Sequence, residues 1–180
     1  GMATDVMNEF GYGYLAGVKD ANPDANILQN NVNSFADTGA GKTAANNMVA
    51  NNADVIFHAA GGTGLGVIDA AKEAGIWAIG VDSDQSKVAP KTILTSAMKR
   101  VDNAVYDEAK AVLDGEYKAG VKTYTLKDGG VDIAPTTDNL PEELLKEVED
   151  VKAKIIAGEI KVPNNKADFE AKYGDIYELD

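Results

Sequence analysis

Two charged side chains of opposite sign, Asp82 and Lys99, follow neighbouring predicted strands. The first comes after the apolar run Ile76–Val81, and the second comes after Thr92–Met98. The carboxyl ends of parallel strands meet at one edge of a sheet, where ligands bind in open α/β folds. A carboxylate accepts hydrogen bonds and an ammonium group donates them, so the pair suits a polyol such as ribose. The alternative is a surface ion pair with no ligand.

A second acid, Asp84, lies two residues beyond Asp82. Two carboxylates at a strand end could bind a cation, accept hydrogen bonds from hydroxyls, or serve only to solvate the loop. The position directly after the strand favours a functional role for Asp82 more than for Asp84.

Two glycine-containing runs resemble phosphate-binding motifs without matching them. The run Gly61–Gly66 lacks the G-x-G-x-x-G spacing of dinucleotide-binding turns, because position 67 is Val67. It predicts a tight strand-to-helix turn, and its backbone amides could either serve packing alone or meet a ligand. The run Gly39–Thr43 lacks the first glycine of a phosphate loop, because position 36 is Ala36. A helix N-terminus with a capping turn is the better interpretation there.

Two ring-bearing residues call for separate interpretations. Phe35 lies in a polar loop just beyond a predicted strand, where it could stack on a flat ring or anchor the loop. His58 is the only histidine and lies inside a predicted strand, which indicates a packed or hydrogen-bonded core residue. A serine–histidine triad would need a histidine in a loop beside a nucleophile, and the sequence offers none.

The stretch Asp54–Asp84 supplies the elements that position these residues. It reads as strand, glycine turn, helix and strand, which is one βαβ unit. Helices and strands alternate up to Leu126, so we predict a three-layer α/β fold with a mainly parallel sheet. The pattern begins with a helix, so the strand that usually opens such a unit is missing. The other predicted strands are Asn26–Val32, Thr92–Met98, Val121–Leu126 and one within Gly129–Pro135, and the other helices are Met7–Lys19, Lys42–Asn52, Val101–Leu113 and Pro141–Ala157.

Composition excludes several classes of protein. The 180 residues have a formal net charge of −12, which argues against nucleic acid as a partner. Cysteine is absent, so there is no disulfide, thiolate metal site or cysteine nucleophile. No apolar run approaches the ~20 residues of a membrane span, and no signal peptide is visible. We predict no catalytic residue, no metal site and no cofactor.

Several long runs, in order, resemble one known family. They are GYLAGVK, SFADTGAGKT, ADVIFHAAGGTGLGVIDAAKEAG, AIGVDSDQ, ILTSAMKRVDNAVYD, GGVDIAP and IIAGEIKVP. Together they resemble the basic membrane protein (BMP) family from about Met7 to Pro163. That family contains substrate-binding lipoproteins of ABC transporters, among them purine nucleoside-binding proteins. The resemblance implies a two-lobed fold of the type I periplasmic-binding-protein class, with the nucleoside held between the lobes.

The resemblance also implies roles for four residues. Phe35 is similar to the family's base-stacking aromatic, and Gly61 is similar to the glycine whose backbone meets the ligand. Asp82 and Lys99 resemble the ligands of the ribose hydroxyls. Guanosine, adenosine and inosine are therefore expected ligands, an ABC permease is the expected partner, and the full-length protein is expected outside the cytoplasm on a lipid anchor.

The sequence departs from the family in length. Family members are about twice as long, so we expect residues 1–163 to be the C-terminal lobe, followed by an acidic tail at 164–180. In this tail Phe169, Tyr173 and Tyr177 are spaced by four residues, which indicates either a terminal helix that packs weakly or a flexible tail. The absent N-terminal lobe would carry the base-reading residues, so weak or no nucleoside binding is expected of this lobe alone. The segment Val101–Leu126 is expected to cross to the absent lobe and to expose an apolar face. We predict a homodimer or strand exchange that covers this face.

Two other functions stay open at this stage. A regulatory sensor lobe could use the same fold, and a different domain preceding this one in the full gene would favour it. A nucleotide-using enzyme is disfavoured by the broken glycine spacings, the lack of cysteine and the lone buried histidine.

Overall fold

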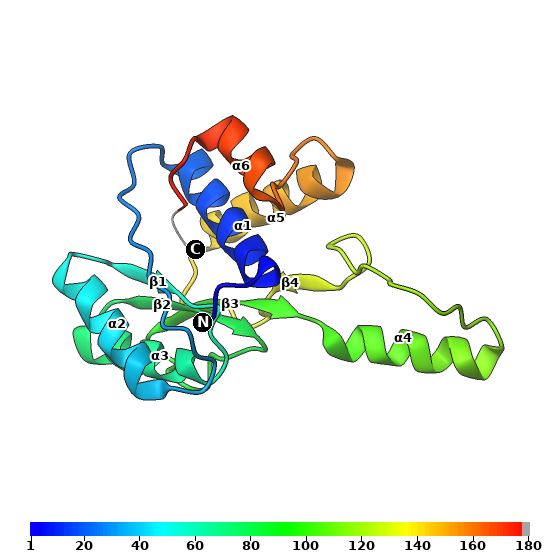
Figure 1. Ribbon diagram of the computed structural model, residues 1–180, viewed down its shortest axis with the longest axis horizontal. Coiled ribbons are helices and arrows are strands. Elements are labelled where there is room, and N and C mark those ends of the chain that lie inside the picture. The colour runs from blue at the N-terminus through cyan, green and yellow to red at the C-terminus, as the bar shows by residue number, and fades with distance from the viewer. Residues whose placement is uncertain (178–180) are drawn as a thin grey trace.

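A four-stranded sheet forms the centre of the molecule, seen in a computed structural model that describes residues 1–177 (Figure 1). The strands lie in the order β1 (Val55–Phe57), β2 (Trp77–Asp82), β3 (Ile93–Lys99) and β4 (Val131–Ile133). The first three are parallel, and β4 is antiparallel to β3. The predicted α/β class with a mainly parallel sheet is confirmed.

Helices cover both faces of the sheet, which gives the three layers predicted (Figure 1). One face carries α2 (Thr38–Ala50) and α3 (Thr63–Ala74), and the other carries α1 (Asp5–Ala21) with α5 (Glu142–Ala157) and α6 (Lys166–Tyr173). No helix that the structure describes is both long and apolar enough to cross a membrane.

The packing of α3 fixes the geometry of the central βαβ unit. Ile68 is 2% exposed and packs with the buried side chains of Ala78 and Ile93 from β2 and β3. On its other side α3 approaches α2 closely, since a Cβ added at Gly66 would lie 1.9 Å from the carbonyl oxygen of Thr38. Gly66 therefore serves helix packing.

Two predicted strands, Asn26–Val32 and Val121–Leu126, are not formed. A strand needs a hydrogen-bonding neighbour, and neither segment pairs with the sheet. The first nevertheless has the burial pattern of a strand, with Ile27 half-buried between exposed Asn26 and Leu28. The alternation of burial is therefore present in this segment, but the strand pairing is not.

The C-terminal region packs firmly, contrary to the prediction of a weakly packed tail. Phe169 of α6 is fully buried in a cluster with Tyr12 and Leu15 of α1 and with Tyr177. The spacing of the aromatic residues by four indicates one apolar helix face. The surface that covers this face is α1, which lies at the other end of the sequence. The predicted tail also includes residues 178–180, which lie outside the described part.

A long arm, residues 101–130, projects away from the sheet (Figure 1). It begins with α4 (Val101–Asp114), which has no buried residue. Tyr106 is 67% exposed and Leu113 is 86% exposed, so the apolar face expected on this segment lies in solvent.

Candidate functional site

The four residues predicted from the sequence line one hollow at the carboxyl edge of the sheet. Phe35 comes from the loop before α2, Gly61 from the turn after β1, Asp82 from the end of β2 and Lys99 from the end of β3. The volume of the hollow is about 250 Å³, below the roughly 300–1,000 Å³ typical of a complete small-molecule site. The remaining lining residues are Met7, Phe10, Ala59, Ala60 and Val81.

Gly61 and Phe35 are locked together by backbone geometry. Gly61 has φ +53°, and a Cβ added there would lie 3.1 Å from the carbonyl oxygen of Phe35. That same oxygen accepts a hydrogen bond of 3.2 Å from the backbone N–H of Thr63. The aromatic loop is thereby fixed against the glycine turn, while Phe35 stays 38% exposed. Part of the Phe35 side chain is thus free for a contact.

Asp82 sits at the centre of a tight three-residue turn. The backbone N–H of Ser83 donates to the carbonyl oxygen of Val81 at 2.8 Å, and Asp82 itself has φ +67°. This positive φ is that of the rare, strained form of γ-turn, and such backbone costs of order 1–3 kcal/mol. Strained residues of this kind cluster at functional sites, which supports a role for the carboxylate beyond loop solvation.

Asp82 and Lys99 form the predicted acid–base pair. The Lys99 Nζ lies 2.8 Å from the Asp82 Oδ1, and each side chain is nearly half exposed. An exposed ion pair of this kind contributes only about 0–1 kcal/mol to stability. The two groups keep unused hydrogen-bonding capacity toward solvent, because a carboxylate has two acceptor oxygens and an ammonium group three donors.

A buried polar network lies beneath the Asp82 turn and was missed at the level of sequence. The Gln85 Oε1 accepts from the Val81 backbone N–H at 3.0 Å and lies 3.0 Å from the His58 Nε2. The Gln85 backbone N–H donates to the Ser96 Oγ at 3.1 Å. Burial lowers the pKa of His58, which keeps the ring neutral as the prediction of a core histidine requires. The only sequence signal for Gln85 was its place in the run DSDQ.

Asp84 belongs to the scaffold and does not line the hollow. Its carboxylate accepts from the Thr136 hydroxyl at 2.5 Å and from the Ser86 backbone N–H at 3.0 Å, and these hydrogen bonds lower its pKa. Asp82 lines the hollow and Asp84 does not, so the two carboxylates lie in different environments. Within residues 1–177, no group of three acidic, histidine or cysteine side chains could hold a metal ion.

Beyond Gly61 and Gly62, the two glycine-containing runs serve packing. The backbone N–H groups of residues 63–65 all donate to carbonyl oxygens of the protein, so the suggested use of these amides by a ligand is wrong for those three. Lys42, the lysine of the second run, forms ion pairs of 2.6 and 2.8 Å with Asp69 and Glu73 of α3. It links two helices and is no phosphate ligand.

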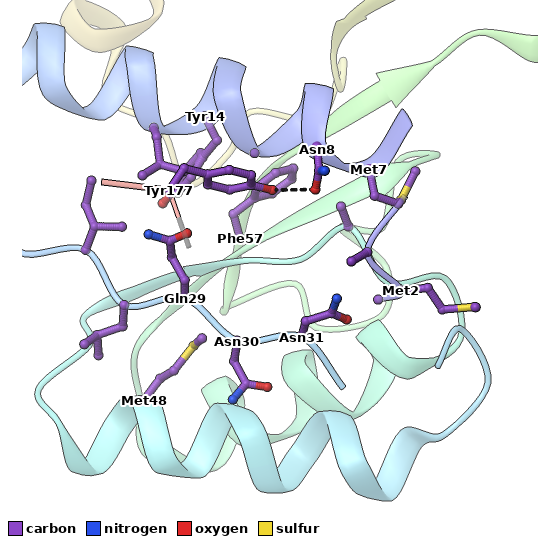
Figure 2. Close-up of a pocket in the computed structure, with 17 residues that line it drawn as sticks. Met2, Met7, Asn8, Tyr14, Gln29, Asn30, Asn31, Met48, Phe57 and Tyr177 are labelled. Carbon is purple, nitrogen blue, oxygen red and sulfur yellow. Dashed lines mark hydrogen bonds between the residues drawn. The ribbon is translucent and has the colours of Figure 1, made fainter. Parts of the chain in front are cut away.

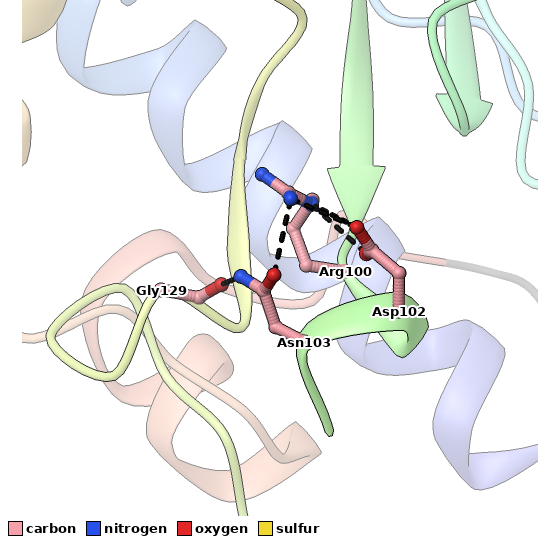
Figure 3. Close-up of polar contacts among 4 residues, drawn as sticks. All are labelled: Arg100, Asp102, Asn103 and Gly129. Carbon is pink, nitrogen blue, oxygen red and sulfur yellow. Dashed lines mark hydrogen bonds and ion pairs between the residues drawn. The ribbon is translucent and has the colours of Figure 1, made fainter. Parts of the chain in front are cut away.

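Polar contacts next to Lys99 hold the base of the arm (Figure 3). The Arg100 guanidinium donates to the carboxylate of Asp102 and, at 3.1 Å, to the Asn103 Oδ1. The Asn103 Nδ2 donates at 2.9 Å to the carbonyl oxygen of Gly129. The outgoing and returning chains of the arm are therefore fastened together where they leave the site.

This architecture is that of one lobe of a solute-binding protein. It is similar to the crystal structure of an ABC transporter solute-binding protein from Aeropyrum pernix, with a TM-score of 0.81 and 29% identity over 94% of this chain and 58% of that one. It is also similar to a transcriptional activator of the comK gene from Bacillus halodurans, with a TM-score of 0.68 and 26% identity over 73% of this chain and 46% of that one.

Residues 1–166 match the sequence model of the Bmp family, described as ABC transporter substrate-binding protein, PnrA-like. The chain belongs to this family. It is 40% identical to basic membrane protein A1 of Borrelia garinii over 94% of its own length and 52% of the relative's. It is also 40% identical to a CD4+ T-cell-stimulating antigen of Listeria monocytogenes, over 91% and 50%. The chain thus spans about half the length of these relatives, and its family consists of binding proteins and not of enzymes.

Proposed function

We propose that this chain is the C-terminal lobe of an ABC transporter substrate-binding protein and forms half of a site for a purine nucleoside. The convergence of Phe35, Gly61, Asp82 and Lys99 on one hollow carries the proposal. No catalytic step is involved, since binding and release are the whole function of such a lobe.

Each of these residues has a distinct task. The exposed part of Phe35 stacks on the purine ring, and Gly61 leaves room for the ligand to approach the backbone. Asp82 accepts hydrogen bonds from the two ribose hydroxyls, and Lys99 donates to a ribose oxygen. The ion pair between Asp82 and Lys99 orients both groups before the ligand arrives.

The open hollow needs a second wall. A first lobe, as in the full-length relatives, would close over the ligand and supply the groups that read the base. The exposed face of the arm is where we expect that lobe to pack, with a homodimer or strand exchange as the alternative when the lobe is absent. The permease is the expected downstream partner, and lipid anchoring outside the cytoplasm is expected of the full-length protein.

Calorimetry with guanosine, adenosine, inosine and ribose tests the proposal, together with amide chemical-shift mapping by NMR at millimolar ligand. We expect weak saturable binding, with shifts centred on Gly61 and Asp82. Lys99→Met and Asp82→Asn should each weaken binding about 10–100-fold, the loss expected when a charge-assisted hydrogen bond is removed. Asparagine tolerates positive φ, so the second variant keeps the turn.

Lys42→Met is the matched control, because Lys42 is also ion-paired but lies outside the hollow. It should leave nucleoside binding unchanged. Binding that survives in Lys99→Met and Asp82→Asn, or shifts that map elsewhere, would remove the assignment of the site.

A regulatory sensor is the second candidate, because the chain is also similar to a solved transcriptional activator. The same hollow would then report ligand binding to an attached domain. Sequencing the complete gene distinguishes the two, since a DNA-binding domain preceding Gly1 would favour the regulator.

A further inference from the structure

A second hollow, with a volume of about 480 Å³, lies at the amino edge of the sheet. It is lined by residues 75–77, where α3 ends and β2 begins, by residues 88–92 before β3, and by Lys72 of α3. Trp77 is the first residue of β2 and Asp82 is the last, so roughly 16 Å of strand separates this amino-edge hollow from the candidate site. A partner bound here would therefore leave the candidate site open.

The amino-edge hollow reverses the charge of the chain as a whole. The chain has 29 acidic and 17 basic side chains, yet Lys72 and Lys91 line this hollow and no acid does. Neither lysine belongs to any of the ion pairs found within residues 1–177. The acids nearest to Lys72 in the sequence of α3, Asp69 and Glu73, are both ion-paired with Lys42. Lys42 is the main cause of the lowered pKa of Asp69, and Lys72 adds a smaller effect.

The hollow shown in Figure 2 provides a contrast. Its volume is about 130 Å³, it lies between α1 and α2, and no charged side chain lines it. The Tyr177 hydroxyl donates to the Asn8 Oδ1 at 3.2 Å within its wall. A positive lining is therefore not a general feature of hollows in this chain.

Large apolar side chains are exposed in the same amino-edge hollow. Trp77 is 40% exposed and Val88 is 49% exposed, and Pro90 is exposed as well. The indole N–H of Trp77 has no hydrogen-bond partner among the residues that the structure describes, so it can donate to a carboxylate or carbonyl oxygen. The hollow thus combines apolar surface with three donor groups, the indole and the two ammonium groups.

Local structure explains only part of this arrangement. Lys72 lies in the last turn of α3, where a cation complements the helix dipole. That role accounts neither for Lys91, which comes from another segment, nor for the exposed Trp77. Single apolar side chains are normal on a protein surface, whereas a group of them around one hollow marks an interaction site.

The walls of the amino-edge hollow favour a protein partner. Most of the lining residues are exposed, whereas a small-molecule site buries about 70–90% of its ligand. Tryptophan is enriched among the residues that dominate the binding energy of protein interfaces. A short acidic segment would meet mainly the local lysines, because charges farther away than about 8–10 Å are screened. An anionic membrane would instead meet a whole chain with a net charge of −12.

We propose that the amino-edge hollow is a docking surface for a partner protein that presents a short acidic segment with one aromatic or branched apolar side chain. The apolar side chain packs on Trp77 and Val88, and the flanking carboxylates pair with Lys72 and Lys91. Docking at this edge requires neither the nucleoside proposed above nor its site.

Tryptophan fluorescence tests the docking surface directly, because Trp77 is the only tryptophan in the chain. The probe is a short peptide with acidic residues on both sides of a phenylalanine–leucine pair, and the matched peptide has lysine in place of each acid. We expect the acidic peptide to change the Trp77 emission saturably, with a Kd in the sub-millimolar range that rises with salt concentration. The lysine peptide should give no saturable change.

A charge reversal that keeps the tryptophan sharpens the test. Lys72→Glu combined with Lys91→Glu should weaken binding of the acidic peptide at least ~30-fold and should allow the lysine peptide to bind. The matched control is Lys118→Glu combined with Lys161→Glu, since both of these lysines are exposed and lie outside the hollow. The control changes the net charge equally and should leave binding of the acidic peptide nearly unchanged.

Three results would overturn the proposal. The first is the absence of a saturable emission change at millimolar acidic peptide. The second is equal binding of the acidic peptide by the charge-reversed variant and its control. The third is a change of Trp77 emission with phosphatidylglycerol vesicles and not with the peptide, which would assign the hollow to a membrane surface.

Discussion

Two helices of similar length, α3 with 12 residues and α4 with 14, differ sharply in how much of each is buried. Seven residues of α3 are buried, and none of α4 is. Both helices have an apolar side, and both end at a glycine in the left-handed conformation, Gly75 with φ +70° and Gly115 with φ +72°. The difference lies in what faces them: α3 packs against both α2 and the sheet, whereas α4 faces solvent (Figure 1).

An amphipathic pattern thus predicts which face of a helix is apolar, and it does not predict what covers that face. Most helical stability in proteins comes from packing of that face, and an isolated helix of this length is marginal in water. The arm is therefore the part of the chain whose stability depends most on a covering surface.

Truncation of one side chain in each helix gives the largest expected contrast. Ile68→Ala in α3 should lower the free energy of unfolding by about 2–5 kcal/mol, because it removes methyl groups from a close-packed core. Val105 of α4 is 63% exposed, so Val105→Ala should change the free energy of unfolding by less than about 0.5 kcal/mol. Urea unfolding measures both. A large, concentration-dependent loss of stability in Val105→Ala would contradict this expectation, since it would show that another copy covers α4.

Acid should weaken the packed region through His58. Burial holds the pKa of His58 below its ordinary value of 6.5, so the folded state keeps the ring neutral while the unfolded chain takes up a proton. The unfolded state therefore binds more protons below about pH 6.5, and stability falls as pH falls, by at most about 1.4 kcal/mol per pH unit. Between pH 7.5 and 5.5, the native protein should therefore lose more stability than His58→Gln does.

Contributions of the other titrating groups cancel in the difference between the native protein and His58→Gln, because both proteins share those groups. Exchange of the amides in α4 should not follow this pH dependence, since the only histidine lies in the packed region. Equal losses in the two proteins would mean that His58 becomes protonated without unfolding.

The two terminal glycines give the smallest and most closely matched contrast. A Cβ added at Gly75 or at Gly115 would meet no atom within 4 Å, so alanine at either position introduces backbone strain alone. Gly75→Ala should cost about 1 kcal/mol of global stability, because α3 unfolds with the core. Gly115→Ala should leave the urea midpoint unchanged and reduce only local helix protection. Equal costs at both sites would show that the arm unfolds together with the core.

Local signals made part of the fold and site predictable. The glycine turn and the apolar runs of Asp54–Asp84 located α3 and β2 because turn geometry and burial act within a few residues. Asp82 and Lys99 could be paired because parallel strands end at one edge. Phe35 and Gly61 drew their predicted roles from the family resemblance, and the structure places both in the same hollow.

Long-range contacts account for what the sequence did not reveal. Asn26–Val32 and Val121–Leu126 alternate like strands, but pairing depends on a neighbour that no local pattern encodes. Met7 and Phe10 line the hollow because the N-terminal part of α1 lies beside it. Gln85 fixes the Asp82 turn through a buried network of hydrogen bonds. The burial of Phe169 likewise depends on α1, at the far end of the chain.

The positive φ of Asp82 has a consequence for the thermodynamics of association. The turn and the ion pair with Lys99 fix the direction of the carboxylate when the chain folds. Ordering a mobile side chain during binding costs about 0.5–1.5 kcal/mol, and a side chain that is already ordered avoids that loss. For the nucleoside proposed here, the entropic cost of ordering the Asp82 carboxylate is therefore met once, when the chain folds, and does not recur each time the ligand binds.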